Sequence, residues 1–304
     1  MPEAPSERAR ELVRGAFDLH VHVAPDVVER RIDDVGLARR FRELGLAGFV
    51  LKSHYTSTAE RARVVSAVVP EVRALGAIAL NRAVGGLNAL AIEIAAREGA
   101  LVVWLPTVDS VNEAGELELK PGATPPVWVR LQLELRERGL PVEPIAVLDA
   151  SGELLPETRA VLASVAAHGL VLATGHLGRE ETFAIVDAAL EAGIEHVVVT
   201  HPDYPAQSFS ADEQAELARR GAWIERCFTT PHTGKVAWEQ WLESTRAVGA
   251  ERCVLSTDLG QKANPPVEDG LALLADRLLD AGFSEEEVRT MAVTNTRRIA
   301  GASG

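Results

Sequence analysis

The stretch FDLHVHV, residues 17–23, is an apolar, β-prone run that carries two histidines separated by one valine. Side chains two residues apart on a β-strand point to the same face, whereas on a helix they point well apart. His20 and His22 can therefore bind one ligand from the same face of the strand, and neutral imidazoles suit a divalent ion such as Zn²⁺. The alternative is two hydrogen-bonded histidines at a strand end, so the rest of the chain must decide.

Short apolar runs like this one recur along the chain, eight in all. They are apolar on both faces, as the strands of a buried parallel sheet are. The seven that follow the first are AGFVLKS (47–53), ALGAIAL (74–80), ALVVWLP (100–106), GLVLATG (169–175), HVVVTH (196–201), AWIERCF (222–228) and RCVLSTD (252–258).

Amphipathic stretches of helical period separate the runs, for example residues 33–45, 56–69 and 179–193. Ser210 and Ser284 each have a glutamate three residues later, which is the capping-box pattern of a helix start. Eight β/α alternations in 304 residues predict a (β/α)8 TIM barrel, formed by residues 1–304 as a single domain.

One interval breaks the rhythm, because more than sixty residues separate the fourth and fifth runs. We expect residues 107–150 to form an insertion at the top of the barrel. The segment VEPIAVLDASGELL within and just beyond it predicts a small β-hairpin that turns at Asp149–Gly152.

Composition excludes several kinds of partner. The formal net charge of −13 disfavours nucleic acid or an anionic membrane surface, and no apolar run approaches the ~20 residues that span a bilayer. Cys227 and Cys253 cannot build a disulfide framework and fit a reducing compartment. Because residues 1–15 carry no hydrophobic signal segment, we expect a cytoplasmic enzyme with a small-molecule substrate.

Chemically active side chains gather where the predicted strands end. His20 and His22 end the first run, His176 follows the fifth, His201 ends the sixth and Asp258 ends the eighth. The C-terminal ends of barrel strands form the rim on which active sites are built, so these residues should meet in space. Each alone is adequately explained as a hydrogen-bonded polar residue, but five together favour a metal site.

This ordered set resembles that of the amidohydrolase superfamily of metal-dependent barrel hydrolases, and the ending VTNTRRIAG is similar to the N-P-A-R-L-L-G ending common there. Within that superfamily the sequence resembles a branch with no assigned substrate. The resemblance implies one or two divalent ions, Zn²⁺ first and Mn²⁺ or Fe²⁺ as alternatives, held by His20, His22, His176, His201 and Asp258. It also implies that Asp258 transfers the proton and that His201 acts on the reacting water.

The chain departs from that pattern at its fourth strand. Two-metal members usually take a bridging lysine or glutamate from it, but LVVWLPT offers neither, and the nearest acids are Asp109 and Glu113 in the loop beyond. Some members take the bridge from the second strand, where Lys52 lies. A carboxylated Lys52 is therefore one interpretation, and a lysine that binds a substrate anion or reaches out to the rim is the other. The number of metals stays open.

Five further residues are candidates for substrate binding because they follow or lie within predicted strands: His54, Tyr55, Tyr204, Arg226 and His232. Arginine grips carboxylates in a bidentate manner, which favours an anionic substrate. We expect hydrolysis of an amide or cyclic amide bond, or of an ester or lactone, with a metal-dependent decarboxylase on the same barrel as the alternative. Barrels of this kind are often oligomeric, so we also expect a homo-oligomer.

Overall fold

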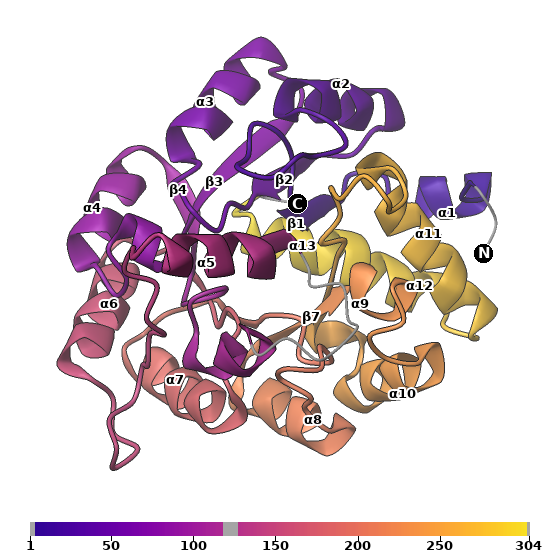
Figure 1. The fold of residues 1–304 in the computed structure, drawn as a ribbon. Coiled ribbons are helices and arrows are strands. Elements are labelled where there is room, and N and C mark those ends of the chain that lie inside the picture. Colours follow the sequence, from indigo (N-terminus) through magenta and orange to yellow (C-terminus); the bar gives the residue numbers. More distant parts are fainter. Residues whose placement is uncertain (1–3, 118–126, 303–304) are drawn as a thin grey trace.

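Eight parallel strands form one sheet in the sequence order β1 to β8, and helices surround it (Figure 1). The computed structural model describes residues 4–117 and 127–302. All eight predicted runs contain a strand, so the predicted (β/α)8 barrel is confirmed. The strands are β1 (Phe17–Val21), β2 (Gly48–Leu51), β3 (Arg73–Ala79), β4 (Ala100–Trp104), β5 (Val171–Ala173), β6 (Val197–Val199), β7 (Trp223–Cys227) and β8 (Cys253–Ser256).

Hydrogen bonds between β1 and the residues that follow β8 close the barrel. The residues after β8 continue along β1: Asp258 N donates to His20 O at 2.8 Å, and His22 N donates to Leu259 O at 2.8 Å. This closure places the end of β8 directly beside the two histidines of β1.

The helices fill the connections between strands and coil around the outside. They are α1 (Glu7–Leu12), α2 (Asp34–Leu44), α3 (Ala59–Val68), α4 (Ala89–Arg97), α5 (Val127–Glu137), α6 (Pro156–Ala167), α7 (Arg179–Glu191), α8 (Ala211–Arg220), α9 (Thr229–His232), α10 (Trp238–Val248), α11 (Val267–Asp280), α12 (Glu285–Arg289) and α13 (Asn295–Ile299). Shorter segments are the 3₁₀ helices η1 (Arg82–Val84), η2 (Val111–Leu117) and η3 (Ala250–Arg252) and the π-helix η4 (Thr290–Thr294). None of the helices in the described ranges is long and apolar enough to span a membrane.

Both predicted capping boxes are present. The hydroxyl of Ser210 accepts a hydrogen bond from Glu213 N at the start of α8, and Ser284 does the same with Glu287 N at the start of α12. In each case the glutamate carboxylate accepts from the backbone N–H of the serine. These reciprocal bonds satisfy donors that a helix start leaves unpaired.

The core has two layers. Phe17, Leu19, Val102, Trp104 and Val254 belong to a buried cluster inside the barrel, and two larger clusters fill the space between the strands and the helices. Burying the strands on both faces explains why each reads as a continuous apolar run.

A bulge in β1 decides which way its histidines face. The pairing of β1 with β2 shifts between Asp18 and Val21. Leu19 lies in the barrel interior, and after the shift the side chains of His20 and His22 also turn inward while Val21 packs outside. The carboxylate of Asp18 supports this bulge by accepting hydrogen bonds from Thr257 N and Oγ1, at 3.0 and 2.6 Å. Bulges commonly re-aim side chains next to active sites.

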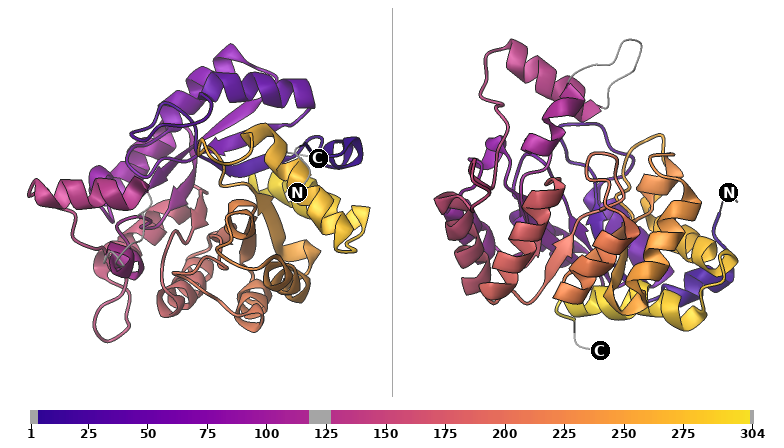
Figure 2. Two further views of the ribbon diagram at one scale, coloured as in Figure 1. Left: turned by 45° about the vertical axis from the view of Figure 1, so that its right-hand side comes forward. Right: turned by 90° about the horizontal axis from the view of Figure 1, so that it is seen from below.

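The segment 107–150 contains more regular structure than predicted. A single antiparallel bridge, Leu148 with Leu154, and a hydrogen bond from Gly152 N to Asp149 O form the expected turn. The helix α5 was not predicted, and Figure 2 shows it at the end of the barrel opposite the C-terminal segment. Residues 118–126 of this insertion lie outside the described residues.

Candidate functional site

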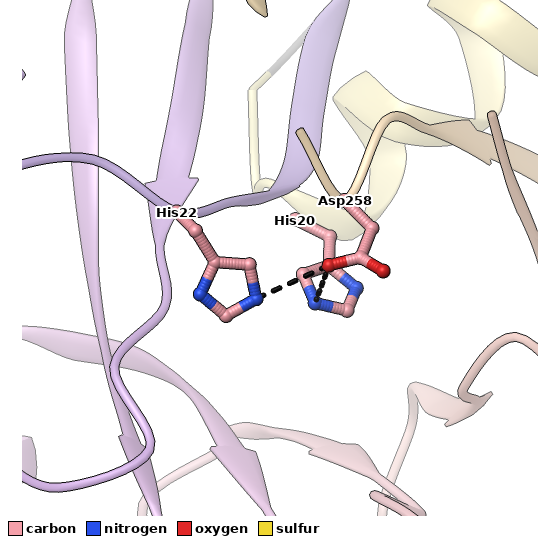
Figure 3. A group of neighbouring side chains, drawn as sticks. All are labelled: His20, His22 and Asp258. Atoms are coloured by element: carbon pink, nitrogen blue, oxygen red, sulfur yellow. Dashed lines mark ion pairs between the residues drawn. The ribbon is translucent and has the colours of Figure 1, made fainter. Parts of the chain in front are cut away.

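Three side chains from the two ends of the sheet converge at the C-terminal rim of the barrel (Figure 3). The Nε2 atom of His20 lies 3.3 Å from Oδ1 of Asp258, and Nε2 of His22 lies 3.1 Å from the same oxygen. His20 comes from β1, His22 follows it and Asp258 follows β8, so barrel closure brings them together.

The spacing of these three atoms fits a metal ion. Ligands bound tetrahedrally to Zn²⁺ at about 2.0–2.1 Å lie about 3.3–3.4 Å from one another. The two contacts of Asp258 Oδ1, at 3.3 and 3.1 Å, are close to that spacing, and all three ligand atoms lie within 4.8 Å of one another. Two imidazole nitrogens and one carboxylate oxygen also form a donor set typical of zinc.

Glu225, a buried glutamate that was not among the predicted site residues, contacts His20 on the side of its ring away from Asp258. Glu225 in β7 places Oε1 3.2 Å from Nδ1 of His20, and its Oε2 accepts a hydrogen bond from His201 N at 3.2 Å. Although burial works against it, His20, His201 and Lys52 lower the pKa of Glu225 to about 2. An ionised carboxylate on Nδ1 leaves Nε2 of His20 as the nitrogen that can bind an ion.

Five histidine rings form a closed circle around this point. Neighbouring ring centroids are 5.3 Å apart for His20 and His22, 5.0 Å for His22 and His54, and 6.0 Å for His54 and His176. The circle is completed by His176 with His201, at 4.9 Å, and by His201 with His20, at 5.9 Å. The structure thus brings together every predicted metal-ligating histidine, and it adds His54 to them.

Burial favours the neutral form of four of these imidazoles, those of His22, His54, His176 and His201. It lowers the pKa of His201 to about 3 and holds the pKa values of His22, His54 and His176 well below the usual range. The pKa of Asp258, by contrast, is held well below its usual range by His20, His22 and His201, which outweigh burial. Neutral imidazoles beside an ionised carboxylate are the protonation states that bind a divalent cation.

Two of the strand-end residues have an unusual backbone. His201 has φ 25° and Asp258 has φ 52°, in the left-handed region that residues other than glycine rarely adopt. A hydrogen bond from Thr229 Oγ1 to Asp258 Oδ2, at 2.9 Å, fixes the second of them. Strain of this kind persists where the surrounding structure enforces it, and it often marks functional positions.

Lys52 lies at the floor of the site. Its side chain is 1% exposed, its Nζ is 3.0 Å from Nε2 of His20, and it sits over the ring of Trp104 at 5.0 Å. Burial lowers the pKa of the amine, against the attraction of Asp258 and Glu225. Lys52 is therefore placed among the candidate ligands and does not reach out to the rim.

The insertion contributes a second buried acid. Glu113 in η2 is 1% exposed, and its Oε1 lies 2.8 Å from Nδ1 of His176. Burial raises its pKa to about 7. Asp109, the other acid noted after the fourth strand, has a structural role because it accepts hydrogen bonds from Arg82 N and from Gln132 Nε2, at 2.7 and 2.6 Å.

Of the predicted substrate-binding residues, His54 belongs to the histidine circle, and Tyr55 and Tyr204 pack against it. Nδ1 of His54 is 2.8 Å from Thr107 Oγ1, and the ring of Tyr55 packs edge-on against His54. The Tyr55 hydroxyl is buried without a hydrogen-bond partner among the described residues. Tyr204 packs against His201, with ring centroids 5.4 Å apart.

Arg226 and His232 do not point into the site. Arg226 is fully buried on the outer side of β7, where Nη1 donates to Asp203 Oδ2 at 2.5 Å and the guanidinium sits over Trp241. His232 stacks on Phe228, which belongs to the outer core cluster. Strand alternation sends Glu225 inward and Arg226 outward, and His232 lies beyond the strand in α9, so the contacts of these two residues do not support the prediction that they bind substrate.

Comparisons with known proteins agree with this architecture. A model of a family of unknown function, DUF6282, matches residues 15–225, and no curated protein matches the chain. An amidohydrolase from Pseudomonas aeruginosa has a similar structure, with a TM-score of 0.63, 13% sequence identity and 98% of this chain and 99% of that one covered.

Two further solved structures are similar. The dipeptidase AC, a metallopeptidase, has a TM-score of 0.59 at 12% identity, with 96% of this chain and 99% of that one covered. An organophosphorus hydrolase from Deinococcus radiodurans has a TM-score of 0.55 at 17% identity, with 98% and 96% covered. At these identities the likeness establishes the fold alone.

Proposed function

The chain belongs to the family of unknown function DUF6282, and we propose that it is a metal-dependent hydrolase of the amidohydrolase type. The observation that carries the proposal is the convergence of His20 Nε2 and His22 Nε2 on one oxygen of Asp258, at 3.3 and 3.1 Å. The bond cleaved is an amide or cyclic amide, or an ester or lactone, in a small anionic substrate.

His20, His22 and Asp258 would hold the ion, with His176 and His201 on the facing side of the histidine circle. Zn²⁺ fits this donor set best, and when bound it supplies an electrophile and a water molecule of lowered pKa. Asp258 is ionised at neutral pH, so its carboxylate accepts a proton from the attacking water and returns it to the leaving group. His201 orients that water, and Lys52 or Tyr55 contacts the anionic or carbonyl oxygens of the substrate.

A test of the proposal measures ions per chain by elemental mass spectrometry after reloading with Zn²⁺, together with turnover on a panel of amides, lactones and carboxylates. We expect bound zinc and hydrolysis that Asp258→Asn abolishes while much of the metal stays bound. A protein that binds no divalent ion after reloading contradicts the proposal. Release of CO₂ from a carboxylated substrate without consumption of water indicates a decarboxylase instead.

The role of Lys52 is tested by the metal content of Lys52→Ala. If a carboxylated Lys52 bridges two ions, the variant loses at least one of them. If the ion count is unchanged while the Michaelis constant for an anionic substrate rises, Lys52 binds substrate. Ser53→Ala is the matched control for the ion count, because the hydroxyl oxygen of this neighbour accepts a hydrogen bond from Tyr55 N and does not face His20.

A further inference from the structure

Glu113 is a buried carboxylate that no described residue satisfies with a hydrogen bond. Both of its oxygens are inaccessible to solvent and neither accepts a hydrogen bond within the described ranges. Leaving a carboxylate in this condition is strongly unfavourable, so native proteins pair such groups or bind them to a metal. Glu225, the comparable glutamate on β7, is instead contacted by both His20 and His201.

The contact between Glu113 and His176 is close but is not a hydrogen bond. Oε1 lies 2.8 Å from Nδ1, yet both atoms lack an aligned partner. The carboxylate therefore lies off the axis along which an N–H would donate. Two ligands of one cation meet in this way, because each directs its lone pair at the ion and not at the other ligand.

The surroundings supply a further donor. The ring of His201 is 4.9 Å from that of His176, and its Nδ1 is buried without a hydrogen-bond partner among the described residues. Backbone contacts hold His176 in place, since its N–H donates to Pro106 O at 3.0 Å. Glu113 and His176 thus lie together on the side of the histidine circle away from His22, with the ring of His201 beside that of His176.

We propose that Glu113 is a metal ligand, and that together with His176 it binds a divalent cation at the half of the site opposite His20, His22 and Asp258. The inference rests on the proposed function, because it needs a metal-loaded site. The proposal assigns to the insertion the carboxylate that strand β4 lacks. The stretch LVVWLPT carries no acidic residue, and η2 contributes Glu113, nine residues after Trp104.

The experiment compares wild type with Glu113→Gln, a substitution that keeps the shape and removes the charge. Each protein is stripped with a chelator and reloaded with Zn²⁺, and its ions are counted by elemental mass spectrometry. We expect Glu113→Gln to hold about one ion per chain fewer than wild type. Glu137→Gln, an exposed glutamate of α5 in the same insertion, is the matched control and keeps the wild-type count.

A second measurement separates ligation from a merely structural role. In the stripped proteins Glu113→Gln should melt about 2 °C or more above wild type, because an uncompensated charge is gone, whereas with zinc the order should reverse. An equal ion count and equal zinc affinity in Glu113→Gln and wild type overturn this inference alone. A wild-type protein that binds no ion overturns the proposed function with it.

Discussion

Glu225 holds His20 from the side away from the candidate metal site, with Oε1 3.2 Å from Nδ1 of the ring. Its second oxygen accepts the backbone N–H of His201, so one carboxylate contacts the ring of one strand-end histidine and the backbone of another. Ligands oriented by such partners bind metal more tightly, because the ring enters the site in the correct tautomer and orientation.

Replacing this glutamate should therefore weaken metal binding. In Glu225→Gln only one oxygen remains to accept two N–H groups, and the charge that favours His20 Nδ1–H is lost. We expect zinc affinity to fall about 10–100-fold, measured by competition with a chromophoric chelator. The exposed Glu239→Gln on α10 should leave it unchanged. Unaltered affinity in Glu225→Gln would show that His20 is oriented without it.

Arg226 should matter for stability and not for metal or substrate. Its only charged partner among the described residues is Asp203, and both side chains are buried. Arg226→Met leaves the carboxylate unpaired, and we expect a loss of about 3–5 kcal/mol in the free energy of unfolding. Urea denaturation measures this loss, and Arg226→Met combined with Asp203→Asn should recover part of it.

The ion content of Arg226→Met should equal that of wild type, because the residue lies outside the barrel. A variant with normal stability but a raised Michaelis constant for substrate would instead place Arg226 in the pocket.

The contrast between Glu225 and Arg226 shows how far the sequence alone could lead. Burial on both faces makes each strand readable, and the rim of a barrel makes strand ends converge, so the eight strands and the converging histidines were predictable. The sequence does not predict which residues of a strand buried on both faces point into the barrel, because AWIERCF carries apolar side chains on both faces. Glu225, which contacts the candidate ligand His20, and Arg226, which forms a structural ion pair, are only one residue apart in the strand.

The same limit applies to residues that arrive from loops. Glu113 was visible as an acid beyond the fourth strand, but its approach to His176 depends on the path of η2, which no periodicity encodes. The helix α5 was missed because its amphipathic pattern follows the loop-like GATPP. The bulge in β1 likewise has no sequence signal beyond Asp18, which accepts hydrogen bonds from Thr257.

The metal-free protein should lose stability as the pH falls below about 6.5. A histidine whose pKa is lowered by folding binds a proton more readily when unfolded, so acid favours the unfolded chain by up to about 1.4 kcal/mol per pH unit for each group. For His201 this window runs from the unfolded value, 6.5, down to about 3. The other histidines with lowered pKa values in the circle are His22, His54 and His176.

Four acids oppose this trend. Folding raises the pKa of Asp18 and of Glu113 to about 7, and raises those of Asp34 and Asp109, so their contribution is largest in acid and is lost as the pH rises. Folding also lowers the pKa values of His196 and His232, so six histidines outweigh four acids, and thermal melts of the stripped protein between pH 4 and 7 should show a rising melting temperature. Added zinc should steepen the rise, because protons compete with the metal for the imidazoles. A flat profile would indicate that the imidazoles are not buried as described.

Gly260 is where the chain leaves β8 and crosses the end of β1. It has φ 137°, and a Cβ there would lie 1.5 Å from the carbonyl oxygen of His22. Gly260→Ala must therefore push His22 or Asp258 out of place, and we expect loss of zinc binding together with a lower melting temperature. Gly193→Ala, at φ 80° with nothing within 4 Å, carries the backbone cost of about 1 kcal/mol without the clash and should keep its metal. If both variants bind zinc equally well, the close approach of β8 to His22 is not what holds the ligands together.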